Sequence, residues 1–277
     1  MTESLKIVVL GAGYVGSAVA REASARGHAV WAVRRNVEKR DEHGVQWVRG
    51  DLATGLFPGL PEVFDAVVLT VAPSRGADGY DDTYPPAARS AVALAARTGA
   101  RSLLYTSSTG VYGGRDGAWV TEASARLGTG EANDALNAAE DLVLASVAAR
   151  PSVLRVAGIC GPGRDPRARM MAAESLPQCG EYWVNLAHRD DIVAALLHVA
   201  QLPEAPAVLN CSDGNPALAA DVARWLAAEQ GRDPATLVFG NDAQRSRSDQ
   251  RVSNAALRAT GWEPQYPSFR ESFGRGL

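Results

Sequence analysis

Short runs of apolar residues alternate along this chain with longer segments in which apolar residues recur at helical spacing. The runs predict buried strands and the longer segments predict covering helices. We expect strands at 6–10, 28–35, 45–52, 65–71, 101–107, 151–156 and 208–212. We expect helices opening at Gly16 and at 87–97, 131–148, 190–200, 217–229 and 253–260.

Strands that alternate with helices form right-handed βαβ units and a parallel sheet covered on both faces. The pattern therefore predicts an α/β fold with a doubly wound parallel sheet, the Rossmann arrangement. Residues 1–157 are expected to form the nucleotide-binding domain. Residues 158–277 are expected to form a small C-terminal α/β cap and substrate region, interleaved with the last strands of the sheet.

A glycine turn follows the first predicted strand directly. Gly11, Gly13 and Gly16 form a G-x-G-x-x-G pattern that leads from the strand into a helix. In this context the first glycine permits a tight turn, the second lets the backbone approach a pyrophosphate, and the third lets the helix pack close to the strand. The positive end of the helix then faces the phosphates. The stretch predicts a dinucleotide site.

The second predicted strand ends in Arg34 and Arg35, with no acidic residue at that position. An acid there would bind the ribose 2′-hydroxyl of NAD, whereas an arginine accommodates the 2′-phosphate of NADP. We therefore expect NADP, with NAD as the less favoured cofactor. Asp51 follows the third strand, where a carboxylate can accept a hydrogen bond from the adenine amino group. The full set of expected cofactor contacts is Gly11, Gly13, Tyr14, Val15, Gly16, Arg34, Arg35, Asp51, Leu52, Val71 and Ala72.

The composition of the chain limits the classes of binding partner that we expect. The 277 residues are 46% hydrophobic and 21% charged, with a formal net charge of −3. That balance is ordinary for a globular domain and gives no sign of a nucleic acid or membrane partner. The three cysteines, Cys160, Cys179 and Cys211, have no C-x-x-C spacing, so we expect incidental thiols and no metal site. No secretory or membrane-spanning segment is predicted, which favours the cytoplasm.

Several separated segments match one pattern in order. They are Gly11–Gly16, Gly50–Leu52, Tyr105–Gly113, Leu154–Gly163, His188–Ile192, Arg251–Leu257 and Gly261–Trp262. Together they resemble the extended short-chain dehydrogenase/reductase family, the NAD-dependent epimerase/dehydratase group. The resemblance implies hydride exchange with a nicotinamide ring, and it implies that Ser108 hydrogen-bonds the substrate oxygen. It also implies a possible homodimer.

The chain departs from that family at its catalytic motif. The family uses a Tyr whose pKa is lowered by a Lys four residues later, but this chain has no lysine after Lys39. Ala132 and Leu136 stand where the Tyr and Lys would lie. Leu10 also replaces the first glycine of the family's longer glycine motif. Both departures resemble the atypical branch of the superfamily.

The acid that replaces this pair is left open. Tyr112, close to Ser108 in sequence, and Glu131, at the start of the corresponding helix, are the candidates. Tyr105 is expected in the core. His188 with its following aspartates is expected to be structural, because it matches the family's hinge segment. Arg164, Arg167 and Arg169, with Trp119, Tyr182 and Trp183, are open between a substrate pocket and ordinary surface or core roles.

The leading function is an NADP-dependent oxidoreductase that acts on a small carbonyl or hydroxyl substrate. A first alternative is nucleotide-sugar epimerisation or dehydration, which the absence of the Tyr–Lys pair disfavours. A second is a non-catalytic NADP-binding sensor or regulatory protein. Substrate screening and a Ser108→Ala substitution would discriminate the enzyme from the sensor.

Overall fold

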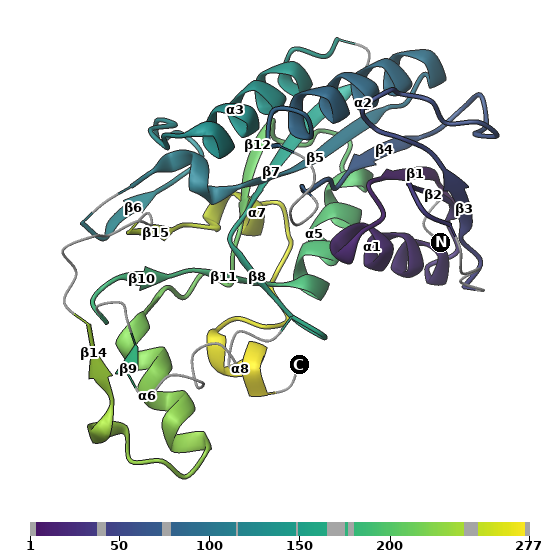
Figure 1. The fold of residues 1–277 in the computed structure, drawn as a ribbon. Coiled ribbons are helices and arrows are strands. Elements are labelled where there is room, and N and C mark those ends of the chain that lie inside the picture. Colours follow the sequence, from purple (N-terminus) through teal and green to yellow (C-terminus); the bar gives the residue numbers. More distant parts are fainter. Residues whose placement is uncertain are drawn as a thin grey trace. The chain divides into compact units, whose positions relative to one another are not determined.

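The computed structural model describes residues 4–37, 43–73, 79–114, 116–147, 149–164, 175–176, 180–240 and 249–274. The chain folds into two compact units, each assembled from separate segments (Figure 1). The first unit comprises Met1–Ser108, Thr129–Arg155 and Ile192–Leu209, and the second comprises Thr109–Gly128, Val156–Asp191 and Asn210–Leu277. The chain therefore passes between the units several times. The domain division expected after residue 157 stays a prediction.

A seven-stranded sheet, in the order β12-β7-β5-β4-β1-β2-β3, forms the centre of the fold. Its strands are β1 (Lys6–Leu10), β2 (Ala29–Arg34), β3 (Gln46–Arg49), β4 (Ala66–Leu69), β5 (Ser102–Ser108), β7 (Arg150–Val156) and β12 (Val208–Cys211). The β1–β2, β1–β4, β2–β3 and β4–β5 pairs are parallel. This confirms the predicted doubly wound parallel sheet.

Helices cover the sheet and explain why its strands are continuous apolar runs. They are α1 (Tyr14–Ala25), α2 (Tyr84–Thr98), α3 (Glu131–Leu144) and α5 (Arg189–Gln201). In Figure 1, α2 and α3 lie side by side, and the two helices contact each other along their length. Strand β4 and all but the first residue of β1 are buried, as expected of strands covered on both faces.

The start of α2 differs from the sequence-based expectation. The helix was expected at 87–97, with Pro85 and Pro86 in the preceding loop, but both prolines lie in its first turn. Proline is well suited to this position because the first amides of a helix have no partner within the helix and because its φ is already helical. Gly99, at φ +65°, ends the helix in the left-handed conformation.

The second unit is built from short paired strands and helices. The strand pairs are β6 (Ala118–Val120) with β15 (Gln250–Val252), β8 (Gly158–Cys160) with β11 (Leu186–His188), β10 (Trp183–Val184) with β13 (Ala217–Leu218), and β9 (Ser175–Leu176) with β14 (Val238–Phe239). The helices are η1 (Thr109–Tyr112), α6 (Ala219–Glu229), η2 (Pro234–Thr236), α7 (Ala255–Ala259) and α8 (Phe269–Gly274). Its apolar core includes Cys160, Leu186, Val222, Leu226, Phe269 and Phe273.

Two negative findings apply to the described ranges alone. No helix among them is long and apolar enough to cross a membrane. No group of three or more His, Cys, Asp or Glu side chains within those ranges is arranged to hold a metal ion.

Candidate dinucleotide site and active site

The predicted cofactor residues all lie in the first unit, at or after the ends of neighbouring strands. The glycine turn follows β1, Arg34 ends β2, Asp51 follows β3, and Val71 follows β4. Because these strands are parallel, their carboxyl ends meet at one edge of the sheet, where open α/β folds bind ligands. Strand β5 ends at the same edge of the sheet, and Ser108 is its last residue.

The three glycines of the turn meet different surroundings. Gly11 has φ +86°, and a Cβ there would lie 2.8 Å from the carbonyl oxygen of Thr70. A Cβ on Gly16 would collide with the Thr70 hydroxyl and would lie 2.5 Å from the Gly11 oxygen. A Cβ on Gly13 would meet nothing closer than the Gly11 oxygen, at 3.9 Å. The described protein atoms therefore require Gly11 and Gly16 but not Gly13, which is exposed.

Helix α1 begins directly after Gly13. Its first residues, Tyr14 and Val15, are half-buried, no side chain caps its N-terminus, and no acidic residue lies in its first turn. The first amides of a helix lack partners within the helix and carry a partial positive charge. The exposed face of Gly13 and this uncapped N-terminus together fit a pyrophosphate.

Arg34 is held in place by a neighbouring strand. Its guanidinium carbon lies 4.4 Å from the centre of the Trp47 ring on β3, a distance typical of cation–π stacking. Arg34 is half-buried, and Arg35 beside it is exposed. Sequence reasoning found both arginines but missed Trp47. The parallel pairing of β2 with β3 places Trp47 opposite Ala32, two residues before Arg34 and therefore on the same face of the sheet.

The segment after β3 forms a tight turn. The exposed Asp51 accepts a hydrogen bond from the Ala53 amide through Oδ1, at 2.9 Å. The carbonyl of Leu52 accepts a hydrogen bond from the Ser90 hydroxyl of α2 at 2.8 Å. After β4, Val71 is half-buried and Ala72 is exposed. These residues lie at the predicted edge, and their contacts with a cofactor remain predictions.

Two serines end β5 with different surroundings. Ser108 is half-buried, whereas Ser107 is 6% exposed, and its hydroxyl has no hydrogen-bond partner among the described residues. Tyr105, two residues earlier, is fully buried, which confirms its place in the core. Burial raises the pKa of the Tyr105 hydroxyl well above its ordinary value, and the neighbouring Tyr84 and Glu140 raise it further.

The two candidate acids lie in different surroundings. Glu131 is exposed, begins α3, and has its Oε1 3.6 Å from where a Cβ on Gly79 would stand, beside the loop that follows β4. Tyr112 belongs to the second unit and is 1% exposed. Its hydroxyl donates to Oδ1 of the buried Asn210 at 2.6 Å.

Helix α3 carries an ion pair that sequence reasoning missed. Glu140 is fully buried and Arg155 of β7 is 4% exposed. Arg155 donates to Glu140 through Nη2 at 2.7 Å and through Nε at 3.0 Å. The sequence contains a signal for this pair. Glu140 stands on the apolar face of a helix and Arg155 stands inside an apolar strand, and their charges are opposite. Leu136, where the family has its lysine, is also buried.

Among the remaining candidates, His188 has a structural setting, Trp119 and Arg164 are exposed, Tyr182 and Trp183 are half-buried, and several others lie outside the described residues. His188 is fully buried, its Nδ1 accepts from the Asp190 amide at 3.2 Å, and the centre of its ring lies 3.7 Å from that of the Tyr266 ring, with the two planes tilted by 31°. The Asp191 carboxylate accepts from two backbone amides in the segment before α8. Cys160 and Cys211 are buried free thiols. Outside the described residues lie Lys39, Arg167, Arg169 and Cys179.

Comparisons with known proteins agree with this geometry. The profile of a family described as NAD(P)H-binding matches residues 11–157. Protein YeeZ of Escherichia coli K12 is 29% identical over 279 residues, spanning 95% of this chain and 96% of YeeZ. A solved structure of a proposed NAD-dependent epimerase/dehydratase from Methylobacillus flagellatus is 26% identical with a TM-score of 0.77, over 98% of this chain and 97% of the other.

The Bordetella bronchiseptica enzyme WbmG, solved with NAD and UDP, has a TM-score of 0.81 at 17% identity, over 99% of this chain and 94% of WbmG. At that identity the likeness concerns the fold. The fold and the glycine turn define a dinucleotide-binding Rossmann protein. This chain belongs to the NAD(P)H-binding family, and its fold is that of the epimerase/dehydratase-like short-chain dehydrogenases/reductases.

Proposed function

We propose that this protein is an NADP-dependent oxidoreductase that acts on a small carbonyl or hydroxyl substrate. The observation that supports NADP is Arg34, which stands at the end of β2 and is stacked on Trp47. A guanidinium held in one orientation loses less conformational entropy when it binds a phosphate. Two buried free thiols, Cys160 and Cys211, support a reducing, cytoplasmic location.

In the proposed active site, some residues bind the cofactor and others orient the substrate. The glycine turn and the first amides of α1 bind the pyrophosphate, Arg34 and Arg35 bind the 2′-phosphate, and Asp51 accepts from the adenine. The bound nicotinamide would supply or accept a hydride. Ser108, at the end of β5, orients the substrate oxygen by a hydrogen bond.

Proton transfer requires a group other than the family's tyrosine. We propose Glu131, because its carboxylate is exposed and lies beside the loop that follows β4. For Tyr112 we propose a positioning role, because its hydroxyl proton is already engaged by Asn210. The buried Glu140–Arg155 pair fixes α3, the helix that begins at Glu131, against the sheet.

The cofactor proposal is tested by titrating the protein with NADPH and NADH, followed by nicotinamide fluorescence. In Arg34→Ala/Arg35→Ala we expect a ten- to hundredfold loss of NADPH affinity and unchanged NADH affinity, because one charge-assisted hydrogen bond contributes about 1.5–3 kcal/mol. Arg26→Ala is the matched control, since Arg26 is paired with Glu22 on α1. Equal binding of NADH and NADPH by the wild type would instead favour NAD.

The catalytic proposal is tested with Ser108→Ala on a panel of small carbonyl substrates. We expect turnover to fall at least tenfold while NADPH affinity stays within twofold, because Ser108 contacts the substrate in this proposal. Glu131→Gln should also lower turnover and leave NADPH affinity intact. Unchanged turnover in Ser108→Ala would remove that residue from the mechanism. NADPH binding without turnover on any substrate would favour the sensor.

A further inference from the structure

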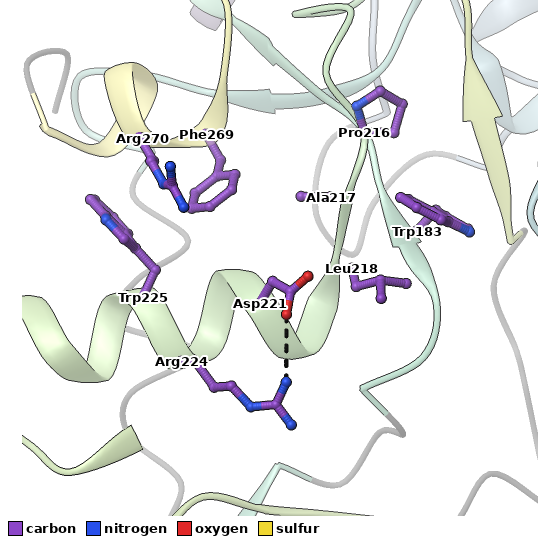
Figure 2. A pocket seen from close by; sticks show the side chains of 9 residues that line it. All are labelled: Trp183, Pro216, Ala217, Leu218, Asp221, Arg224, Trp225, Phe269 and Arg270. Atoms are coloured by element: carbon purple, nitrogen blue, oxygen red, sulfur yellow. Dashed lines mark hydrogen bonds and ion pairs between the residues drawn. The ribbon is translucent and has the colours of Figure 1, made fainter. Parts of the chain in front are cut away.

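A pocket of about 550 Å³ lies wholly within the second unit (Figure 2). None of the residues proposed for the cofactor or for catalysis lines it. Its walls come from β10, β13, α6 and α8, and the volume falls in the range usual for small-molecule sites. The lining residues are Trp183, Pro216, Ala217, Leu218, Asp221, Arg224, Trp225, Phe269 and Arg270.

Three aromatic side chains from three separate elements line this pocket, and each is held in place. Trp225 of α6 meets Phe269 of α8 edge to face at 5.5 Å. The Trp183 amide donates to Asp249 at 2.9 Å, and its ring lies 4.9 Å from the guanidinium of Arg251. In Figure 2, Trp225 and Phe269 lie at the left of the view and Trp183 at the right. Rigid aromatic walls offer contact to a planar ring at little entropic cost.

Two arginines add charge to these walls. The guanidinium of Arg270 lies 5.5 Å from the centre of the Phe269 ring. Arg224 reaches Asp221 at 3.5 Å, which is a long contact, and both side chains are more than half exposed, at 53% and 59%. With one carboxylate against two guanidinium groups, the lining residues carry a formal charge of +1. A planar guanidinium presents paired donors that match a carboxylate or a phosphate.

We propose that this pocket binds a planar aromatic ligand that carries a carboxylate or phosphate group. The ring packs between the aromatic walls, and the anionic group pairs with Arg270 at the rim. A neutral aromatic compound would not pair with the Arg270 guanidinium, and a bare anion would not pack against the aromatic side chains. The ring and the charge are therefore both required. This binding is separate from the proposed hydride chemistry.

The test titrates the full-length protein with benzoate and with phenyl phosphate at constant ionic strength. Binding is followed by the indole N–H signals of Trp183 and Trp225 in NMR spectra, assigned with single Trp→Phe variants. We expect at least one of the two anions to shift both signals saturably, and the tighter of the two identifies the preferred anionic group. Benzyl alcohol supplies the ring alone and inorganic phosphate the charge alone, and both should bind at least tenfold more weakly.

Two variants keep the proposal falsifiable. Arg270→Ala should weaken binding at least tenfold, and Arg224→Ala should weaken it less, because Arg224 is already paired with Asp221. Arg258→Ala is the matched control, since Arg258 is about half exposed, pairs with Glu263 and does not line the pocket. Binding of neither anion, equal binding of benzyl alcohol, or full affinity in Arg270→Ala would each overturn the proposal.

Discussion

At the scale of single residues, the glycines of the turn after β1 have two different roles. Gly11 and Gly16 are required by the protein's own atoms, through a left-handed φ and through close contact with Thr70. Gly13 is under neither constraint, so a side chain there would project into space that the described protein atoms leave open. The pattern of glycines is visible in the sequence. Which of them is required for packing and which leaves room for a ligand depends on contacts with Thr70, the residue that follows β4.

This difference predicts opposite behaviour for two alanine substitutions. Gly16→Ala should lower the free energy of unfolding by about 1–3 kcal/mol, because the new methyl group overpacks against Thr70 and the Gly11 carbonyl. Gly13→Ala should leave stability unchanged within about 0.5 kcal/mol and weaken NADPH binding at least tenfold. Urea denaturation and nicotinamide fluorescence measure the two effects. If Gly13→Ala bound NADPH normally, the pyrophosphate would not lie against this turn.

At the scale of elements, the sheet, the long helices and the short helix α7 follow the sequence closely, whereas the short paired strands of the second unit do not. Strands covered on both faces are continuous apolar runs, so their positions were predicted to within a few residues. β6 and β15 have only three residues each, too few to show an alternating pattern. Their pairing depends on the second unit's tertiary contacts, which sequence patterns do not encode.

The α3–β7 connection allows a stability prediction at this scale. Glu140→Gln should destabilise the protein by about 3–5 kcal/mol, because Arg155 would keep a buried charge without its counterion. Glu22→Gln is the matched control: Glu22 pairs with Arg26 on α1, but both side chains are more than 40% exposed. An exposed pair of this kind contributes about 0.2–0.5 kcal/mol. Similar losses in the two variants, measured by urea denaturation, would contradict the structural role assigned to the buried pair.

At the scale of the whole molecule, the sequence predicted a parallel sheet and a second region, but not how the chain divides between them. A segment as short as 109–128 belongs to the second unit while its neighbours on both sides belong to the first. The spacing of hydrophobic residues indicates whether a residue is buried, but it does not indicate in which of the two units the residue is buried. The buried aspartates of the second unit, which include Asp191, Asp213 and Asp249, were not predicted for the same reason.

We expect Asp213 to make the stability of the protein depend on pH. Burial raises the pKa of its carboxyl well above the ordinary value, the Asn215 amide that donates to it opposes this, and the carboxylates of Asp191 and Glu271 raise the pKa further. Because the folded-state pKa lies above the unfolded value, protonation favours the folded state. This contribution is fully present below the unfolded pKa of about 4 and is lost as pH rises through the folded pKa.

Asp213→Asn should therefore be more stable than the wild type at pH 7, by about 1.4 kcal/mol for each unit by which the pKa is raised, and equally stable near pH 4. The amide oxygen can still accept from the Asn215 amide, so the turn is retained. Asp233→Asn is the matched control, because exposed Asp233 accepts the Ala235 amide in the same way at 2.9 Å. Urea denaturation across this pH range measures both variants. A gain at pH 7 in both, or in neither, would show that burial of Asp213 does not govern the pH dependence.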